Sequence, residues 1–240
     1  MKFQEMDQVR KSQVRRQVTE FENRFQGQEY DITDIVIRPD LTLEKYRIHR
    51  GTFQSDRMAA VVFAGWIADN PEEYQGKSVI DMFCGGGIQG IVALLRGAEH
   101  VTFADISTDA CQDTEENLAF YGLQGKATVV KSDLFQGIDK PADLIIANPP
   151  FFPCEPIEGK PISATMCMPT EKLEEFYRDA RNYGPRIVLS HWDFAGTEND
   201  PAVLGPKFDW QVEKKLLLPT GYGLQTSAKE SHFKVDLLTR

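Results

Sequence analysis

The sequence predicts an α/β fold with a doubly wound, mostly parallel seven-stranded sheet that ends in an antiparallel hairpin. Two observations support this prediction. First, apolar segments rich in β-branched residues alternate with helical segments between residues 77 and 192. Second, two further apolar segments follow near the C-terminus, at residues 210–219 and 231–239, with no convincing helix between them. Parallel strands need helical crossovers, and strands buried on both faces are almost continuously apolar. A helix and two short strands precede this pattern, and we expect them to form a small N-terminal extension.

Residues 1–54 are expected to form this extension. The apolar residues Val14, Val18, Phe21 and Phe25 recur at helical spacing, which predicts an amphipathic helix over residues 4–26. Two alternating apolar and polar runs follow, and they indicate a hairpin or two edge strands at residues 31–39 and 43–49.

Residues 55–240 are expected to form the main domain, which a helix over residues 55–69 begins. The buried strands of the parallel part are predicted at residues 77–83, 100–106, 126–132, 142–148 and 186–192. Helices are predicted at residues 87–97, 107–122 and 170–184. The final hairpin is expected to pair residues 210–219 with 231–239, joined by the glycine-containing segment 220–230.

The composition limits the partners of the chain. The 240 residues carry a net charge of −9, which speaks against a general nucleic-acid binder. Residues 1–60, however, hold 11 Lys and Arg against 10 Asp and Glu, whereas the remaining residues hold 16 against 26. A contact with a polyanion would therefore be local and near the N-terminal part. The basic side of the first helix suits a solvated face better than an RNA contact; it holds Arg10, Lys11, Arg15 and Arg16.

Membrane, secretion and metal features are not expected. No apolar run reaches the roughly 18–20 residues of a membrane span, and residues 1–17 lack the apolar stretch of a secretory signal. The four cysteines form no CxxC pair and no metal-ligand spacing with histidines, so we expect free thiols; they are Cys84, Cys111, Cys154 and Cys167. These features predict a reduced, cytoplasmic setting.

A glycine-rich loop follows the first strand of the main domain. Gly85, Gly87 and Gly90 fit G-x-G-x-x-G, and Asp105 closes the next strand. Glycines let a nucleotide approach the backbone, the helix N-terminus offers free N–H groups, and the carboxylate accepts hydrogen bonds from ribose hydroxyls. By itself this pattern suits NAD as well as other nucleotides.

Three further polar residues follow other predicted strands or lie within one. Asp81 lies within the first strand, where a carboxylate suits a ligand with an ammonium group better than a dinucleotide. Asp133 follows the third strand, within reach of an adenine amine, and Asn148 follows the fourth. Each could simply cap a loop, but ligands of open α/β sheets bind at the carboxyl ends of the strands, where all these side chains gather.

Together, "VIDMFCGGG", Asp105, "SDLF" and "NPPF" resemble the class I S-adenosylmethionine-dependent methyltransferases of the small methyltransferase domain type. The resemblance covers about residues 50–195, including "RGTFQSDRMAA" ahead of the glycine loop, and it implies a Rossmann-like methyltransferase fold. Such enzymes methylate guanine or adenine amines in RNA and glutamine amides in proteins. Phe83 stands where the family usually has its first glycine, a replacement that several RNA-modifying members share.

The resemblance also implies which residues bind S-adenosylmethionine. Asp81 and the backbone of Gly85–Gly87 would hold the methionine part, and Asp105 the ribose. Asp133 and Leu134 would contact the adenine. The other positions implied to contact the cofactor are Phe83, Cys84, Ile106 and Asn148. Cys84 is equally explained as a small core residue.

Asn148, Pro149, Pro150 and Phe151 are the expected catalytic residues. The nitrogen of an aromatic amine or amide is a poor nucleophile because its lone pair is delocalised. The Asn148 amide oxygen and the Pro149 carbonyl can accept hydrogen bonds from its two N–H groups and leave the lone pair facing the methyl group. The prolines fix the backbone before the substrate binds. Phe151 offers a flat face for a planar group, whereas Phe152 suits packing and His191 suits a structural role.

Several acceptors fit this site. An amine of an RNA base, in transfer or ribosomal RNA, is favoured slightly, and a glutamine of a protein is nearly as good. A small-molecule amine is third, and a module that only binds the cofactor is the alternative outside enzymes. The sequence does not predict an oligomeric state.

Overall fold

The computed structural model describes residues 1–25, 27–220 and 231–240. The chain forms two compact units. One comprises Gly27–Asn148 with Ala180–Ile187, and the other comprises Met1–Gln26, Pro149–Asp179 and Val188–Arg240. The division expected at residue 54 stays a prediction. The segment 221–230, expected to join the last two strands, lies outside the described residues.

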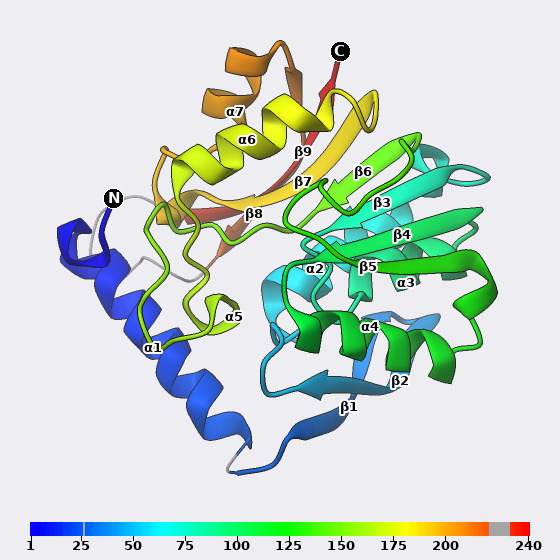
Figure 1. Cartoon of the computed structure of the whole chain (residues 1–240), viewed down its shortest axis with the longest axis horizontal. Coiled ribbons are helices and arrows are strands. Elements are labelled where there is room, and N and C mark those ends of the chain that lie inside the picture. Colours follow the sequence, from blue (N-terminus) through cyan, green and yellow to red (C-terminus); the bar gives the residue numbers. More distant parts are fainter. Residues whose placement is uncertain (26, 221–230) are drawn as a thin grey trace. The chain divides into compact units, whose positions relative to one another are not determined.

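The sheet has seven strands in the hydrogen-bonded order β5-β4-β3-β6-β7-β9-β8 (Figure 1). β3 runs parallel to β4 and β6, β4 runs parallel to β5, and β8 pairs with β9 antiparallel. The strands are β3 (Ser78–Met82), β4 (His100–Asp105), β5 (Ala127–Lys131), β6 (Leu144–Ala147), β7 (Arg186–Trp192), β8 (Gln211–Thr220) and β9 (Ser231–Thr239). The predicted fold class is confirmed.

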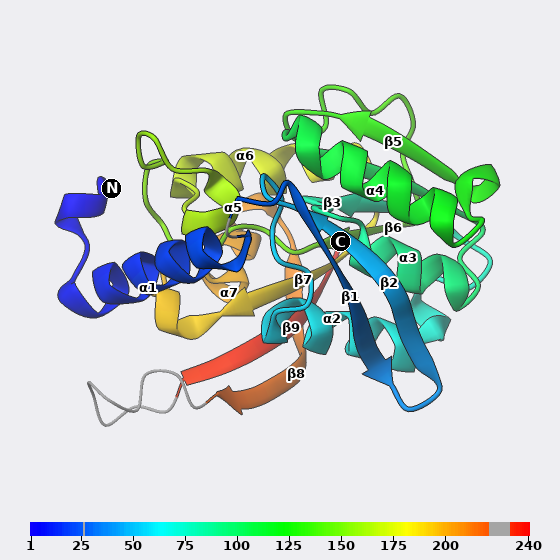
Figure 2. The same ribbon diagram turned by 90° about the horizontal axis from the view of Figure 1, so that it is seen from below.

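In the unit of residues 27–148, three helices lie on one side of β3, β4 and β5, and a hairpin lies beyond them (Figures 1 and 2). The helices are α2 (Met58–Asp69), α3 (Ile88–Leu95) and α4 (Thr108–Phe120), and the 3₁₀ turns are η2 (Pro71–Glu73) and η3 (Gln124–Lys126). The hairpin pairs β1 (Tyr30–Arg38) antiparallel with β2 (Leu41–His49). It buries Ile35, Leu43, Tyr46 and Ile48 beneath it, whereas Val36 on the outer face is 63% exposed.

Local sequence explains where these helices begin and end. Ser107 caps α4 by accepting a hydrogen bond from the Ala110 N–H, and Gly122 with φ +68° follows its end, as the sequence predicted. α2 begins three residues later than expected, because Gln54 accepts hydrogen bonds from Arg57 through both its backbone carbonyl and its side chain. These bonds keep residues 54–57 in a turn before the helix.

The other unit contains the N-terminal helix. α1 (Gln8–Phe25) follows the 3₁₀ turn η1 (Phe3–Glu5) and buries Val14, Phe21 and Phe25. α6 (Thr170–Ala180) buries one face with Leu173, Phe176, Tyr177 and Ala180, which recur at helical spacing. The shorter elements are α5 (Ile162–Thr165), η4 (Asp193–Ala195), α7 (Pro201–Leu204) and η5 (Gly205–Phe208).

The cysteines divide into two kinds. Cys84 and Cys111 are free, buried thiols, as expected. The expectation of free thiols at Cys154 and Cys167 was wrong, because these residues form a disulfide with Cα atoms 5.1 Å apart. The Phe152 N–H donates to the Met166 carbonyl, and the Met168 N–H donates to the Phe152 carbonyl. This backbone pairing folds the proline-rich segment back on itself and brings Cys154 and Cys167 together.

Candidate active site

The glycine loop turns sharply between β3 and α3. Gly87, the residue before α3, has φ +85°, and a Cβ there would come within 3.0 Å of the Thr114 side chain. A Cβ at Gly90 would lie 2.3 Å from the ring of Phe103. Phe83 also adopts a positive φ, of +60°, which fits its place at a position that is usually glycine in the family resembled. The backbone here therefore combines positive φ angles with close approaches of neighbouring side chains, and both favour glycine.

Asp81 lies inside the fold beneath this loop. Its side chain is fully buried, and Oδ2 accepts the Gly90 N–H at 2.8 Å. Among the described residues, its Oδ1 has no hydrogen-bond partner. Burial raises the pKa of this carboxyl to about 7. A donor such as the ammonium group of S-adenosylmethionine would satisfy Oδ1 and stabilise the charged form, so this residue fits that cofactor.

Replacing Asp81 by asparagine should flatten the pH dependence of stability. The folded-state pKa of about 7 lies above the ordinary value of 3.8, so the folded protein binds this proton more tightly than the unfolded chain. The free energy of unfolding therefore decreases as the pH rises from about 4 to 7, by roughly 4 kcal/mol at most from this group. The introduced amide would keep an acceptor for the Gly90 N–H without titrating.

Urea unfolding of both proteins at pH 4.5 and pH 8 measures this difference. Asp81→Asn should lose less stability between the two pH values than the wild type. Asp139→Asn, at an exposed position of the same unit, should keep the wild-type behaviour. Equal losses in the wild type and in Asp81→Asn would contradict the effect ascribed to burial.

Asp105 ends β4 and connects two segments of the site. Its Oδ2 accepts the Gly85 N–H at 3.0 Å, and its Oδ1 accepts the Ser107 N–H at 2.9 Å. Burial raises the pKa of this carboxyl. Ile106 beside it is 54% exposed. Its expected contact with the cofactor stays a prediction.

Asp133 and Leu134 lie in a tight turn after β5. The Ser132 N–H donates to the Asp105 carbonyl at 2.8 Å, so this turn adjoins the end of β4. The Ser132 hydroxyl donates to the Leu134 carbonyl and accepts the Gly137 N–H. The expected ribose and adenine residues are thus neighbours. Cys84, by contrast, packs inward against Thr114 with 3% exposure, and its expected contact with the cofactor stays a prediction.

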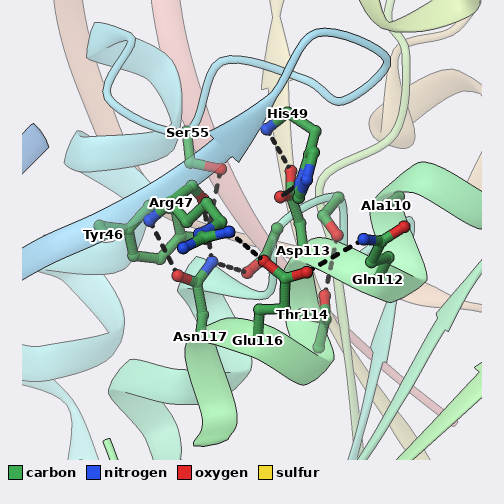
Figure 3. Close-up of polar contacts among 12 residues, drawn as sticks. Tyr46, Arg47, His49, Ser55, Ala110, Gln112, Asp113, Thr114, Glu116 and Asn117 are labelled. Carbon is green, nitrogen blue, oxygen red and sulfur yellow. Dashed lines mark hydrogen bonds and ion pairs between the residues drawn. The ribbon is translucent and has the colours of Figure 1, made fainter. Parts of the chain in front are cut away.

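Buried polar residues of α4 hold the glycine loop from behind (Figure 3). The Thr114 hydroxyl donates to the Gly85 carbonyl at 2.8 Å, and Asn117 Nδ2 donates to the Gly86 carbonyl at 3.2 Å. Asn117 also donates to the Arg47 carbonyl and accepts the Arg47 N–H. This amide therefore joins the glycine loop to β2.

Asp113 makes a second connection from α4 to the hairpin. This fully buried carboxylate accepts the backbone N–H of His49 at 2.8 Å and also pairs with its ring Nδ1 (Figure 3). Burial raises the pKa of Asp113. Asp113, Thr114 and Asn117 were not predicted from the sequence. Their only signal is polar residues on the inner face of an amphipathic helix.

The segment ahead of α2 also lies against the glycine loop. A Cβ at Gly85 would lie 3.7 Å from Phe53 and 4.0 Å from Thr52. Ser55 is buried and lies 3.4 Å from the hydroxyl of Tyr46. The stretch "RGTFQSDRMAA" therefore contributes to the surroundings of the loop.

Asn148 follows β6 directly. It is the last residue of the segment Gly27–Asn148, which forms most of one compact unit. It is partly exposed, as is Pro150, whereas Pro149 is buried. At the carboxyl end of β6, Asn148 follows the strand that pairs with β3, and β3 carries Asp81. The sheet therefore brings Asn148 to the same edge as the glycine loop.

Phe151 belongs to an aromatic cluster within the other unit. It is 8% exposed, and its ring centroid lies 5.0 Å from that of Phe152, 5.8 Å from Trp192 and 6.0 Å from Phe194. Phe152 is fully buried and packs, as expected. Trp192 and Phe194 were not predicted as site residues, because in the sequence they are typical of the end of a strand. Phe194 is partly exposed, whereas the other three rings are buried.

His191 precedes this cluster. It is 4% exposed, and burial lowers its pKa to about 4, so the imidazole is neutral at pH 7.

Among the described residues, no group of His, Cys, Asp and Glu could hold a metal ion. In the part of the chain that the structure describes, no helix is long and apolar enough to cross a membrane.

Comparison with known proteins gives a consistent result. The model of the methyltransferase small domain family matches residues 54–166. Ribosomal protein L11 methyltransferase of Carboxydothermus hydrogenoformans is 40% identical over 73 residues, which are 30% of this chain and 24% of that protein. Release factor glutamine methyltransferase of Borreliella burgdorferi is 31% identical over 112 residues, which are 47% of this chain and 38% of that protein. The chain thus spans well under half the length of these relatives.

Solved structures share the fold. A 16S rRNA N2 G1207 methyltransferase of Thermus thermophilus, in complex with AdoMet and guanosine, has a TM-score of 0.59 at 16% identity and matches 88% of this chain and 50% of that one. A putative RNA methyltransferase of Pyrococcus horikoshii has a TM-score of 0.55 at 18% identity, over 95% and 98% of the two chains. Residues 54–166 therefore resemble a methyltransferase small domain, and the chain shares its fold with solved structures of methyltransferases.

Proposed function

We propose that the protein transfers the methyl group of S-adenosylmethionine to a planar amino or amide nitrogen, with an exocyclic amine of an RNA base as the first candidate. The observation that supports this most directly is that Asn148, the first residue of Asn148-Pro149-Pro150-Phe151, directly follows β6, which pairs with the strand that carries Asp81. Cofactor residues and amine-holding residues would then meet at one edge of the sheet.

The cofactor would supply an activated methyl group, and the chain would hold both partners in line. The loop of Gly85–Gly87 and the carboxylates Asp81, Asp105 and Asp133 would bind it. The Asn148 amide oxygen and the Pro149 carbonyl would accept hydrogen bonds from the two N–H groups of the nitrogen that receives the methyl group. Positioning and fixed hydrogen-bond acceptors supply this catalysis without a strong general base.

A protein glutamine is the second candidate. It is favoured by the relative that is named a release factor glutamine methyltransferase and by the net charge of −9. A base amine and a glutamine amide both present a planar NH₂ group, so Asn148 and Pro149 would serve either substrate. A partner in translation, either RNA or a protein, and a cytoplasmic location are part of this proposal.

The cofactor is tested by calorimetric titration with S-adenosylmethionine, its demethylated product and NAD. We expect binding of the first two and none of NAD, because Asp81 is buried and its Oδ1, which has no hydrogen-bond partner among the described residues, suits an ammonium group. Binding of NAD alone would overturn the proposal.

The acceptor is tested with labelled S-adenosylmethionine and extract from cells that lack the gene. Label in nuclease-sensitive material supports an RNA base, and label in protease-sensitive material supports glutamine. Label only in small metabolites rejects both candidates, and an absence of label identifies a module that only binds the cofactor.

A further inference from the structure

Arg10 of α1 reaches the turn that follows β7. Its Nη1 donates to the Ala195 carbonyl at 2.9 Å and lies 3.2 Å from a Glu198 carboxylate oxygen. Its Nε pairs with Asp7, the residue before the helix. The Arg10 side chain is 17% exposed, so this is a largely buried guanidinium held at both ends. Such charge-assisted hydrogen bonds are stronger and more directional than neutral ones.

The turn is shaped to receive this guanidinium. Gly196 has φ +114°, a conformation that side chains rarely adopt. A Cβ there would lie 2.6 Å from Arg10 Nη1 and 2.2 Å from Glu198 Oε2. Glycine suits this position because of the backbone angle, and a side chain there would also have to displace the Arg10 guanidinium or the Glu198 carboxylate.

The same turn carries the aromatic residues that surround Phe151. The Phe194 ring lies 4.7 Å from Trp192, 5.4 Å from Phe152 and 6.0 Å from Phe151, measured between centroids. Ala195, which Arg10 holds, is the next residue after Phe194. The contacts therefore run from α1 through η4 to the residues that directly follow Asn148-Pro149-Pro150.

The N-terminal segment, with Met1 and with Glu22 of α1, also contacts the proline-rich segment. The Glu155 N–H donates to the Met1 carbonyl at 2.8 Å, and Lys160 forms an ion pair with Glu22. Both segments that contribute rings to the cluster are thus attached to the N-terminal segment within one unit.

We propose that Arg10 is a positioning residue for the methyl acceptor: through Arg10, α1 holds the η4 turn so that Trp192 and Phe194 fix the ring of Phe151. This inference rests on the proposed function, because the placement of Phe151 matters only if a planar acceptor binds beside Asn148. It gives the N-terminal helix a role in arranging the acceptor site. Phe194, the most exposed of the four rings, becomes the member best placed to touch the acceptor.

Replacing Arg10 by alanine tests the proposal, with Arg16→Ala as the matched control. Arg16 lies on the same helix, and its guanidinium pairs with Glu20 at the surface. Arg10→Ala should lower kcat/KM for the acceptor by roughly 10–100-fold, since small misplacements of a reacting group cost up to about 100-fold. The Kd for S-adenosylmethionine should change less than about twofold, and Arg16→Ala should match the wild type. Arg10→Lys should recover part of the loss because an ammonium can still donate to the Ala195 carbonyl.

Near-ultraviolet circular dichroism supplies a second measurement that does not depend on activity. The aromatic signal should change in Arg10→Ala and stay unchanged in Arg16→Ala. An unchanged kcat/KM in Arg10→Ala, or an equal loss of cofactor affinity, would overturn the inference. If the wild type methylates nothing, the proposed function fails by itself. The dichroism then decides whether Arg10 fixes the cluster, and an unchanged signal rejects the inference.

Phe194→Leu keeps the proposal testable if Arg10→Ala does not fold. Leucine preserves apolar packing without an aromatic ring, and the bonds of Arg10 to the Ala195 carbonyl and to Glu198 do not involve the Phe194 side chain. This variant should show the same pattern, with a weakened acceptor reaction and unchanged cofactor affinity. Wild-type kinetics in Phe194→Leu would then reject the role of the cluster.

Discussion

The rate of methyl transfer should fall roughly 10²–10³-fold when Asn148 is replaced by alanine, while the Kd for S-adenosylmethionine stays nearly unchanged. The lost hydrogen bond would act mainly in the transition state, and removing one preorganised hydrogen-bonding group of this kind has about that effect. The expected cofactor contacts come mainly from Asp81 of β3, Asp105 of β4 and Asp133, which follows β5. Single-turnover rates and calorimetric titration separate the two quantities.

Asn148→Asp is the matched comparison for this variant. A carboxylate keeps an acceptor oxygen at the same place, so we expect partial activity where alanine has almost none. A normal rate in Asn148→Ala would show that residues 148–151 are only a rigid connection. The acceptor would then not be an amine held in this way.

Asp105→Ala should show the opposite pattern, with cofactor binding weakened first. This carboxylate holds the Gly85 and Ser107 N–H groups and is the expected ribose ligand. A hydrogen bond to a charged group contributes about 1.5–3 kcal/mol, and about 1.4 kcal/mol corresponds to tenfold in affinity. The Kd should therefore rise at least about tenfold, whereas kcat at saturating cofactor should fall much less.

Titration of Asp105→Ala beside Asp139→Ala measures this effect. Asp139 is an exposed carboxylate of the same unit, and its removal should leave the Kd unchanged. Equal affinity in Asp105→Ala and the wild type would remove Asp105 from the cofactor site.

The strand ends of the site could be predicted because local sequence determines them. Asp105 and Asn148 each end a buried apolar run, and the alternation of strands and helices orders those runs in the sheet. Parallel strands then bring their carboxyl ends to one edge without further information. The glycines could be predicted because few other residues tolerate the backbone angles of such a loop.

Residues whose partners are distant in the sequence could not be predicted. Asn117 bonds to Arg47, 70 residues away, and Arg10 bonds to Ala195, 185 residues away. Neither residue has a local pattern that reveals such a partner. The Cys154–Cys167 disulfide was missed for a similar reason, since it depends on how Phe152 pairs with the backbone of residues 166 and 168. The expected contacts with the cofactor and the acceptor stay predictions.

The way α4 holds the hairpin also bears on how this protein could be redesigned. Asn117 binds backbone atoms of Arg47 and Gly86, and Asp113 binds the backbone N–H of His49. Every residue type except proline offers those atoms. The outward side chains of β1, such as Ile32 and Val36, can therefore be exchanged without cutting these anchors. The outer face of the hairpin could thus be redesigned to bind a new partner while the contacts that hold the glycine loop are kept.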